Sequence, residues 1–172
     1  MSIVTTSSPH DPVAWLLMFV RAARRAGAAL LDPATAADAV EYFQQLPDYR
    51  RVLEQALFPL LKHRLRDDDE NEQEETLRSA IFIASGTLQT CVELLPALPS
   101  LQPPEAASVR GQREIFHSNL EQHLDKMEVI ILPALHTHLV SGDISQLASS
   151  LGHHAPQASS TSPPVHSPEK YP

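Results

Sequence analysis

The chain has 172 residues, of which 42% are apolar, so it is long enough to build one domain with a sizeable core. Its 21 acidic and 13 basic side chains give a net charge of −8, which argues against nucleic acid and anionic membranes as partners, because both attract basic surfaces. Five glycines and long segments rich in Ala, Leu, Glu and Gln favour helices. An all-α fold is therefore expected.

The N-terminal part predicts a short polar leader followed by a helix. Residues 1–10 are rich in Ser and Thr, and we expect them to be disordered. Asp11 and Pro12 are typical of an N-cap and a first helical position, and the apolar pattern then continues to about Leu31. The run "VAWLLMFV" has only eight residues and no basic residue before it, so it predicts neither a signal peptide nor a membrane span. A cytoplasmic protein is expected.

The next two helices follow from similar signals. Asp32 and Pro33 repeat the N-cap pattern, and the second helix should continue to Leu65 with a bend at Pro47. The run "DDDENEQEE" at 67–75 holds seven carboxylates, which suit the solvated N-terminus of a third helix ending near Leu95. A calcium loop would need a glycine and alternating ligands, so a cation-binding role for this run is less favoured.

The C-terminal half predicts one more long helix and a short one. A proline-rich connection, "LPALPSLQPPEA", precedes a fourth helix expected from about Pro104 to Val140, and a short amphipathic helix should end near Leu151. Residues 153–172 contain too few apolar groups to order themselves and are expected to be disordered. Residues 11–152 then form an antiparallel up-down four-helix bundle with a short extra C-terminal helix. The single cysteine, Cys91, lies in an apolar run and is expected to be buried and inert.

One apolar phrase occurs twice, seventy-four residues apart. "ALFPLLKHRL" at 56–65 and "IILPALHTHL" at 130–139 share a proline, Pro59 and Pro133, inside helical stretches. A proline has no N–H and leaves a carbonyl one turn upstream without its usual partner. The two phrases lie near the ends of the second and fourth helices, which are at the same level of an up-down bundle. The pair is typical of a duplicated helical hairpin.

The context of these prolines resembles the hemerythrin-like family, whose members are small four-helix bundles that hold a pair of non-haem irons. In that family the second and fourth helices carry a histidine, a carboxylate four residues later and a proline ten residues after the histidine. The segment "HLDKMEVIILPALHTHL" begins at His123, ten residues before Pro133. The segments "DPVAWLLMFVRAARRAGAALL", "VEYFQQLPDYRRVLEQALFPLL" and "SGDISQLASSL" are also similar to the family, so the resemblance covers about Asp11 to Leu151.

The ligands that this resemblance implies are mostly missing. His123 matches the family histidine, but Met127 stands at the carboxylate position, and Glu128 is one residue out of phase. In the second helix Tyr49 and Leu53 stand at the corresponding positions, with Glu54 one residue out of phase. Neither the first helix near Phe19 and Val20 nor the third-helix stretch "SAIFIASGTLQT" offers a histidine. About one of seven expected ligands remains. An apolar refilling of the metal centre by Tyr49, Leu53 and Met127 is expected, since uncompensated charges there would be unfavourable.

Two functional hypotheses remain from the sequence. The first is a degenerate hemerythrin-like bundle that is not an enzyme, needs no cofactor, and acts as an interaction or regulatory module with a protein partner of unspecified identity. The second keeps a reduced non-haem iron site at His123, with Glu128 or Tyr49 recruited, for sensing oxygen, nitric oxide or iron as the resemblance implies. A hydrolase or transferase has almost no support, because no phosphate loop, nucleophile elbow or paired-cysteine motif occurs. Arg21, Arg24 and Arg25 are expected to lie on a solvated face and to pair with acidic neighbours.

Overall fold

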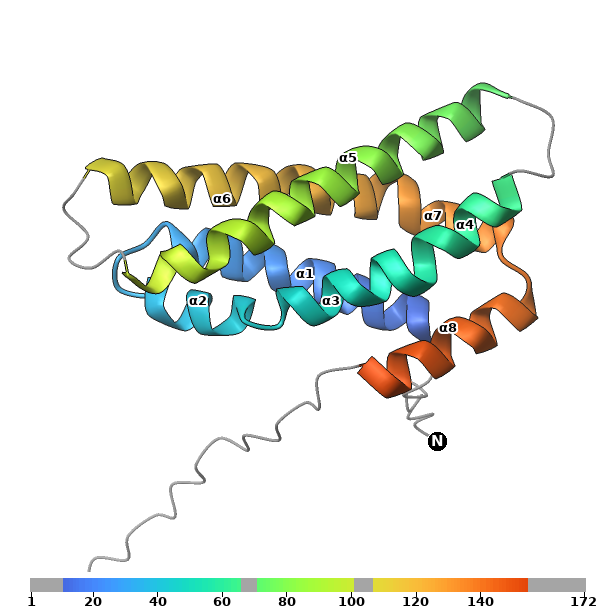
Figure 1. Ribbon diagram of the computed structural model, residues 1–172, viewed down its shortest axis with the longest axis horizontal. Helices are drawn as coiled ribbons and strands as arrows, with labels where there is room; N and C mark the ends of the chain where they lie inside the picture. The colour runs from blue at the N-terminus through green and yellow to red at the C-terminus, as the bar shows by residue number, and fades with distance from the viewer. Residues whose placement is uncertain (1–10, 66–70, 101–106, 155–172) are drawn as a thin grey trace, which may run out of the picture.

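The computed structural model describes residues 11–65, 71–100 and 107–154, and these residues are helical throughout apart from short turns. The helices pack as a bundle in which successive long segments run back and forth along the longest axis of the molecule (Figure 1). No strand occurs within the described ranges. The all-α prediction is confirmed for this part of the chain. The predicted leader at 1–10 and most of the predicted tail, residues 155–172, lie outside the described residues.

The first helix, α1 (Pro12–Leu30), begins and ends where the sequence predicts. The Asp11 side chain accepts hydrogen bonds from the backbone N–H groups of Val13, at 3.0 Å, and Ala14, at 3.2 Å. These bonds satisfy two of the donors that a helix N-terminus leaves free, and Pro12 has no N–H to satisfy. The apolar side of α1 faces the bundle, with Leu16, Val20 and Ala23 fully buried.

The second helical segment is broken more often than the sequence predicts. It consists of α2 (Ala36–Phe43), α3 (Leu46–Val52), a π-helix η1 (Leu53–Leu57) and α4 (Phe58–Leu65). The predicted start at Asp32 and Pro33 is wrong, because these residues form a turn in which Asp32 Oδ1 accepts from the backbone N–H of Ala34 at 3.0 Å. The predicted bend is present, with Pro47 in the first turn of α3.

The third segment is α5 (Glu72–Leu94), continued by a 3₁₀ helix, η2 (Leu95–Ser100). Its N-cap is Asn71, whose side chain accepts from the Glu74 backbone N–H at 2.9 Å. The prediction of a solvated acidic run holds for Glu72 and Glu75, whereas Glu74 is only 2% exposed, because it shares the inward face of α5 with Leu77. Residues 67–70 of that run lie outside the described residues.

An 18-residue window within Glu72–Leu98 has a mean hydropathy of 1.4, so by length and composition this helix could cross a membrane, a feature that was not predicted from the sequence. In the structure this helix packs along α6 and buries Ile81, Ala84 and Leu88. A core helix of a bundle has the same composition, so the apolar run is accounted for by packing.

The last segments are α6 (Ala107–Lys126), a second π-helix η3 (Met127–Ile131), α7 (Leu132–His138) and α8 (Ser141–His154). Of the predicted fourth helix, residues 104–106 lie outside the described residues. The predicted short C-terminal helix is confirmed and reaches His154, two residues into the predicted tail. It is held to α4 by Arg64, whose guanidinium donates to both carboxylate oxygens of Asp143, at 2.8 and 2.9 Å.

Candidate functional site

The two proline-containing segments widen into π-helices at corresponding places. The π-helix Leu53–Leu57 ends two residues before Pro59, and the π-helix Met127–Ile131 ends two residues before Pro133. In each, the first residue after the π-helix donates its backbone N–H to the carbonyl five residues back, from Phe58 to Leu53 and from Leu132 to Met127. A wider turn relieves the crowding that a proline ring causes in an α-helix. The two similar phrases, which lie 74 residues apart in the sequence, therefore also have the same backbone geometry.

Four residues before each π-helix lies a buried polar side chain, and the two meet. Tyr49 of α3 and His123 of α6 are 1% and 0% exposed, and the Tyr49 hydroxyl lies 2.9 Å from His123 Nε2. His123 Nδ1 lies 2.8 Å from the backbone carbonyl of Ala84 in α5. Because a carbonyl only accepts, Nδ1 carries the proton, and Nε2 must accept the hydrogen bond from Tyr49. Both nitrogens of a neutral imidazole are thus satisfied.

Burial fixes the protonation state of this pair. Removal from water lowers the pKa of His123 to about 4, and the hydrogen bond to Ala84 opposes that shift only partly. Burial also raises the pKa of Tyr49, so its hydroxyl stays protonated. A neutral imidazole that accepts from a neutral phenol is the stable arrangement at neutral pH.

Aromatic and apolar side chains surround the pair. The ring of Phe19 stacks on Tyr49 with centroids 3.9 Å apart, and the His123 ring meets Tyr49 edge-on at 5.5 Å. Leu53 and Met127, at the positions where the resemblance implies carboxylates, are both fully buried. The centre of the bundle is therefore a packed apolar core that contains one hydrogen-bonded polar pair.

Glu54 and Glu128, which each lie one residue after an implied carboxylate position, form ion pairs away from His123. Glu128 accepts from Arg24 at 3.0 Å and has a side chain that is 41% exposed, and Glu54 pairs with Arg50 at 3.1 Å. The π-helices therefore do not turn these carboxylates towards His123. Of the candidate residues named from the sequence, Tyr49 and His123 are in contact, Leu53 and Met127 are buried in the core, and Glu128 pairs with Arg24 at the surface.

These residues do not fit the metal centre that the resemblance implies. A di-iron site needs several imidazoles and bridging carboxylates, whereas this centre offers one imidazole with both nitrogens engaged and one phenol that burial keeps protonated. Across the described ranges, no group of three or more His, Cys, Asp or Glu side chains is placed to hold a metal ion.

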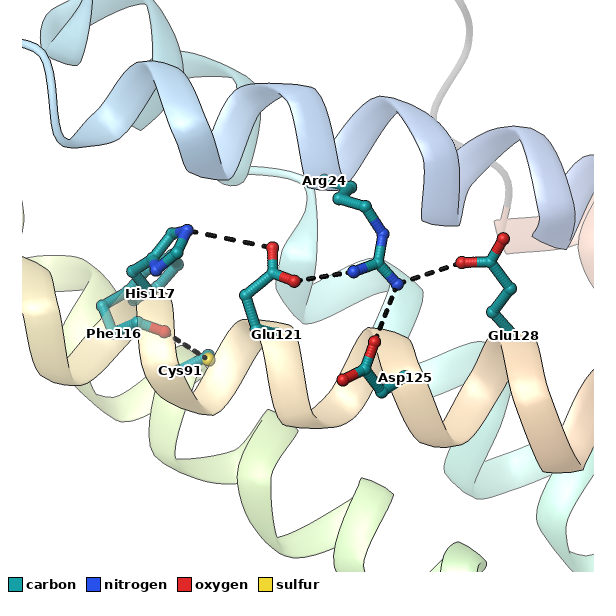
Figure 2. A network of polar contacts seen from close by, with 7 residues as sticks. All are labelled: Arg24, Cys91, Phe116, His117, Glu121, Asp125 and Glu128. Atoms are coloured by element: carbon teal, nitrogen blue, oxygen red, sulfur yellow. Dashed lines mark hydrogen bonds and ion pairs between the residues drawn. The ribbon is translucent and has the colours of Figure 1, made fainter.

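Arg24 forms a second polar cluster, on the surface between α1 and α6 (Figure 2). Its guanidinium donates to Glu121 at 2.6 Å, to Asp125 at 3.1 Å and to Glu128 at 3.0 Å. Partial burial acts to lower the pKa of Arg24, but the carboxylates outweigh it and raise the pKa. The predicted pairing of this arginine with acidic neighbours is confirmed. Its role is to join α1 to α6 and η3.

The thiol of Cys91 lies deeper, behind α6 in the same view. It is fully buried, lies 3.6 Å from the Phe116 carbonyl, and burial raises its pKa to about 12. The nucleophilic thiolate is therefore scarce at neutral pH. The prediction of a buried cysteine is confirmed.

Neither the π-helices nor the pairing of Tyr49 with His123 was predicted from the sequence. The signal for both was present in the 74-residue spacing, because Tyr49 and His123 are as far apart in the chain as the two prolines. The same spacing of 74 residues, extended upstream from the prolines, relates Tyr49 to His123.

Comparison of the chain with protein-family models, with curated proteins and with solved structures finds no match. The hemerythrin-like resemblance therefore stays a prediction, supported by the sequence segments quoted for it.

Proposed function

We propose that the protein is an up-down four-helix bundle of the hemerythrin type that folds without metal and acts as a non-enzymatic interaction or regulatory module. The observation that carries this proposal is the Tyr49–His123 hydrogen bond. The Tyr49 hydroxyl lies 2.9 Å from Nε2 of His123, the histidine that matches the family, and the Ala84 carbonyl lies 2.8 Å from its Nδ1. A side chain satisfied in this way stabilises a closed core and leaves no lone pair for a metal.

Packing supports the same proposal. Large side chains fill the level at which the resemblance implies ligands, among them Tyr49 and Leu53 from the second segment and Met127 from the fourth. Each fully buried large apolar side chain contributes about 1.5 to 3 kcal/mol to folding. A centre of this kind stabilises the bundle by itself, so its surface is what remains for function.

The surface of α5 supports a role in contact with another protein. From Ser79 to Val92 the chain has no charged residue, and Phe82, on the outer side of this stretch, is 82% exposed. An uncharged helical face with an exposed aromatic side chain is more typical of a contact surface than of a solvated one. Substitution of Phe82 is therefore the most direct test of whether this surface binds a partner.

The proposal is tested by capture from the native cell with the full chain. A tagged wild-type protein, a Phe82→Ser variant and a matched Val140→Ser variant, which also removes an exposed apolar side chain, are compared by cross-linking and mass spectrometry. We expect one protein to be enriched with the wild type and with Val140→Ser, and to be lost with Phe82→Ser. Identical capture by all three would contradict a role for this face. Iron bound stoichiometrically to the purified chain would contradict the proposal as a whole.

A further inference from the structure

A small hollow lies at the opposite end of α6 from the π-helix, where α6 begins and α1 ends. Its volume is about 310 Å³, and it is lined by Leu31, Pro33, Arg110, Arg113 and Glu114. Arg110 and Arg113 belong to the first two turns of α6, and Leu31 caps the C-terminus of α1. This hollow shares no residue with the Tyr49–His123 centre.

Arg113 is largely buried, and no counter-charge for it lies among the residues that the structure describes. It is only 8% exposed, and its Nε is buried without a hydrogen-bond partner. Among the residues that the structure places, no carboxylate lies within ion-pairing distance of Arg113 or Arg110. An arginine stays charged at every physiological pH, and burying a charge without a partner is strongly unfavourable. The Nε–Hε group of Arg113 is therefore available to donate to an anion in the hollow.

The end of α1 does not supply that missing partner. A cation near a helix C-terminus can bond to the last carbonyls of the helix. Here the carbonyl of Ala28 accepts from the Leu31 N–H at 3.3 Å, and that of Ala29 accepts from the Asp32 N–H at 3.2 Å and from Thr35 Oγ1 at 2.8 Å. These bonds are local to the turn that follows α1. The guanidinium of Arg113 is left to face the hollow.

The surroundings favour a small oxyanion. Two guanidinium groups can each donate two parallel hydrogen bonds to a carboxylate or a phosphate group. Glu114 lines the same hollow from its exposed rim, which limits the negative charge that the site accepts.

We propose that this hollow binds a small oxyanion, a phosphate group or a carboxylate, through Arg113 with Arg110 in support. The inference is independent of the proposed function, since it concerns neither the bundle centre nor Phe82. It assigns a ligand to the two arginines near the start of α6, in a chain whose net charge is −8.

The test titrates the full-length protein with inorganic phosphate and, separately, with acetate, at constant ionic strength set with sodium chloride. The first readout is the Nε–Hε signal of Arg113 in a nitrogen–proton correlation spectrum, assigned by its absence in Arg113→Met. The second is the melting temperature, which should rise by on the order of 5 °C at about one hundred times the dissociation constant. We expect a saturable change in both readouts with at least one of the two anions, and the tighter-binding anion identifies the ligand class.

Two variants separate binding from general charge effects. Arg113→Met should lose the anion-dependent rise in melting temperature, while Arg25→Met, at an exposed arginine of α1, should keep it. Without anion, Arg113→Met should melt at a higher temperature than the wild type, because it removes an uncompensated buried charge. An Arg113 signal in the wild type that responds to neither anion would overturn the inference, as would a melting response that Arg113→Met retains.

Discussion

Tyr49 donates a hydrogen bond to His123, and each of the two residues precedes a π-helix by four positions. The pair takes the place at which the family resemblance implies metal ligands. The stability of the bundle should therefore depend on this hydrogen bond in a way that single and double substitutions can separate.

Tyr49→Phe should lower the free energy of unfolding by about 1 to 3 kcal/mol, because it leaves His123 Nε2 buried without a donor. The double variant Tyr49→Phe with His123→Leu should recover most of that loss, since replacing both polar partners by apolar groups leaves no orphaned atom. Urea denaturation of the wild type, both single variants and the double variant measures the coupling. Additive losses would show that the two side chains do not act as a pair.

The same pair predicts how stability depends on pH. His123 has a folded-state pKa of about 4 and an unfolded value of 6.5, so between these pH values the unfolded chain binds the extra proton. Its contribution to stability is complete above pH 6.5 and is lost as the pH falls to about 4, by on the order of 3 kcal/mol. Denaturation at a series of pH values should show this loss in the wild type and a flatter profile in His123→Leu. Equal slopes for the two proteins would contradict a buried neutral imidazole.

Arg24→Met should lower stability only modestly, by about 1 kcal/mol at low salt, because its three ion pairs are partly exposed and screened by solvent. The loss should shrink at high salt. Arg25→Met is the matched control, an exposed neighbour on the same helix. Thermal unfolding at low and high salt measures the difference, and a large loss that salt does not reduce would show that Arg24 acts through packing instead.

Asp143→Asn should loosen α8 without unfolding the rest of the bundle. The bidentate bond from Arg64 lowers the pKa of Asp143, and together with the bond from the Val140 N–H it anchors the start of α8. Removing the charge should cost about 2 kcal/mol. Amide hydrogen exchange should become faster in α8 while α5 stays protected.

The pH dependence of exchange in α8 has a defined sign. Because the folded-state pKa of Asp143 is depressed, the contribution of Asp143 to the stability of α8 is present above the unfolded pKa of 3.8 and is lost as the pH falls through the folded-state pKa.

Unchanged exchange in α8 of Asp143→Asn at neutral pH would mean that the buried Leu147 and Leu151 suffice to hold this helix.

Local signals in the sequence predicted the helices well where a single cap decides the boundary. Asp11 with Pro12 starts α1 as predicted, and part of the acidic run predicted at the start of the third helix lies in the first turn of α5, although its N-cap, Asn71, was not predicted. The same reasoning was wrong at Asp32 and Pro33, because the Asp32 side chain bonds within a turn, and the helix starts only after Thr35, whose hydroxyl bonds back to Ala29. Competing local hydrogen bonds decide such a boundary, and composition does not reveal which of them form.

The residues of the candidate site were named from the sequence, but the hydrogen bonds between them were not predicted. The resemblance to the hemerythrin-like family identified His123, Tyr49, Leu53 and Met127. The structure places Tyr49 and His123 in contact and buries Leu53 and Met127 in the core. The direction of the Tyr49 hydroxyl depends on how α3 and α6 pack, and the carbonyl of Ala84 comes from a third helix. Burial of Arg113 likewise depends on the meeting of α1 and α6, which no local pattern indicates.

Metal analysis of the protein tests the central claim most directly. Protein purified from iron-replete cells without chelators, together with the His123→Leu variant, is measured by elemental mass spectrometry and by absorption spectroscopy. A core closed by the Tyr49–His123 hydrogen bond predicts iron far below one atom per chain in both proteins and no absorption from an oxo-bridged centre. One or two irons per chain in the wild type, lost in His123→Leu, would contradict it.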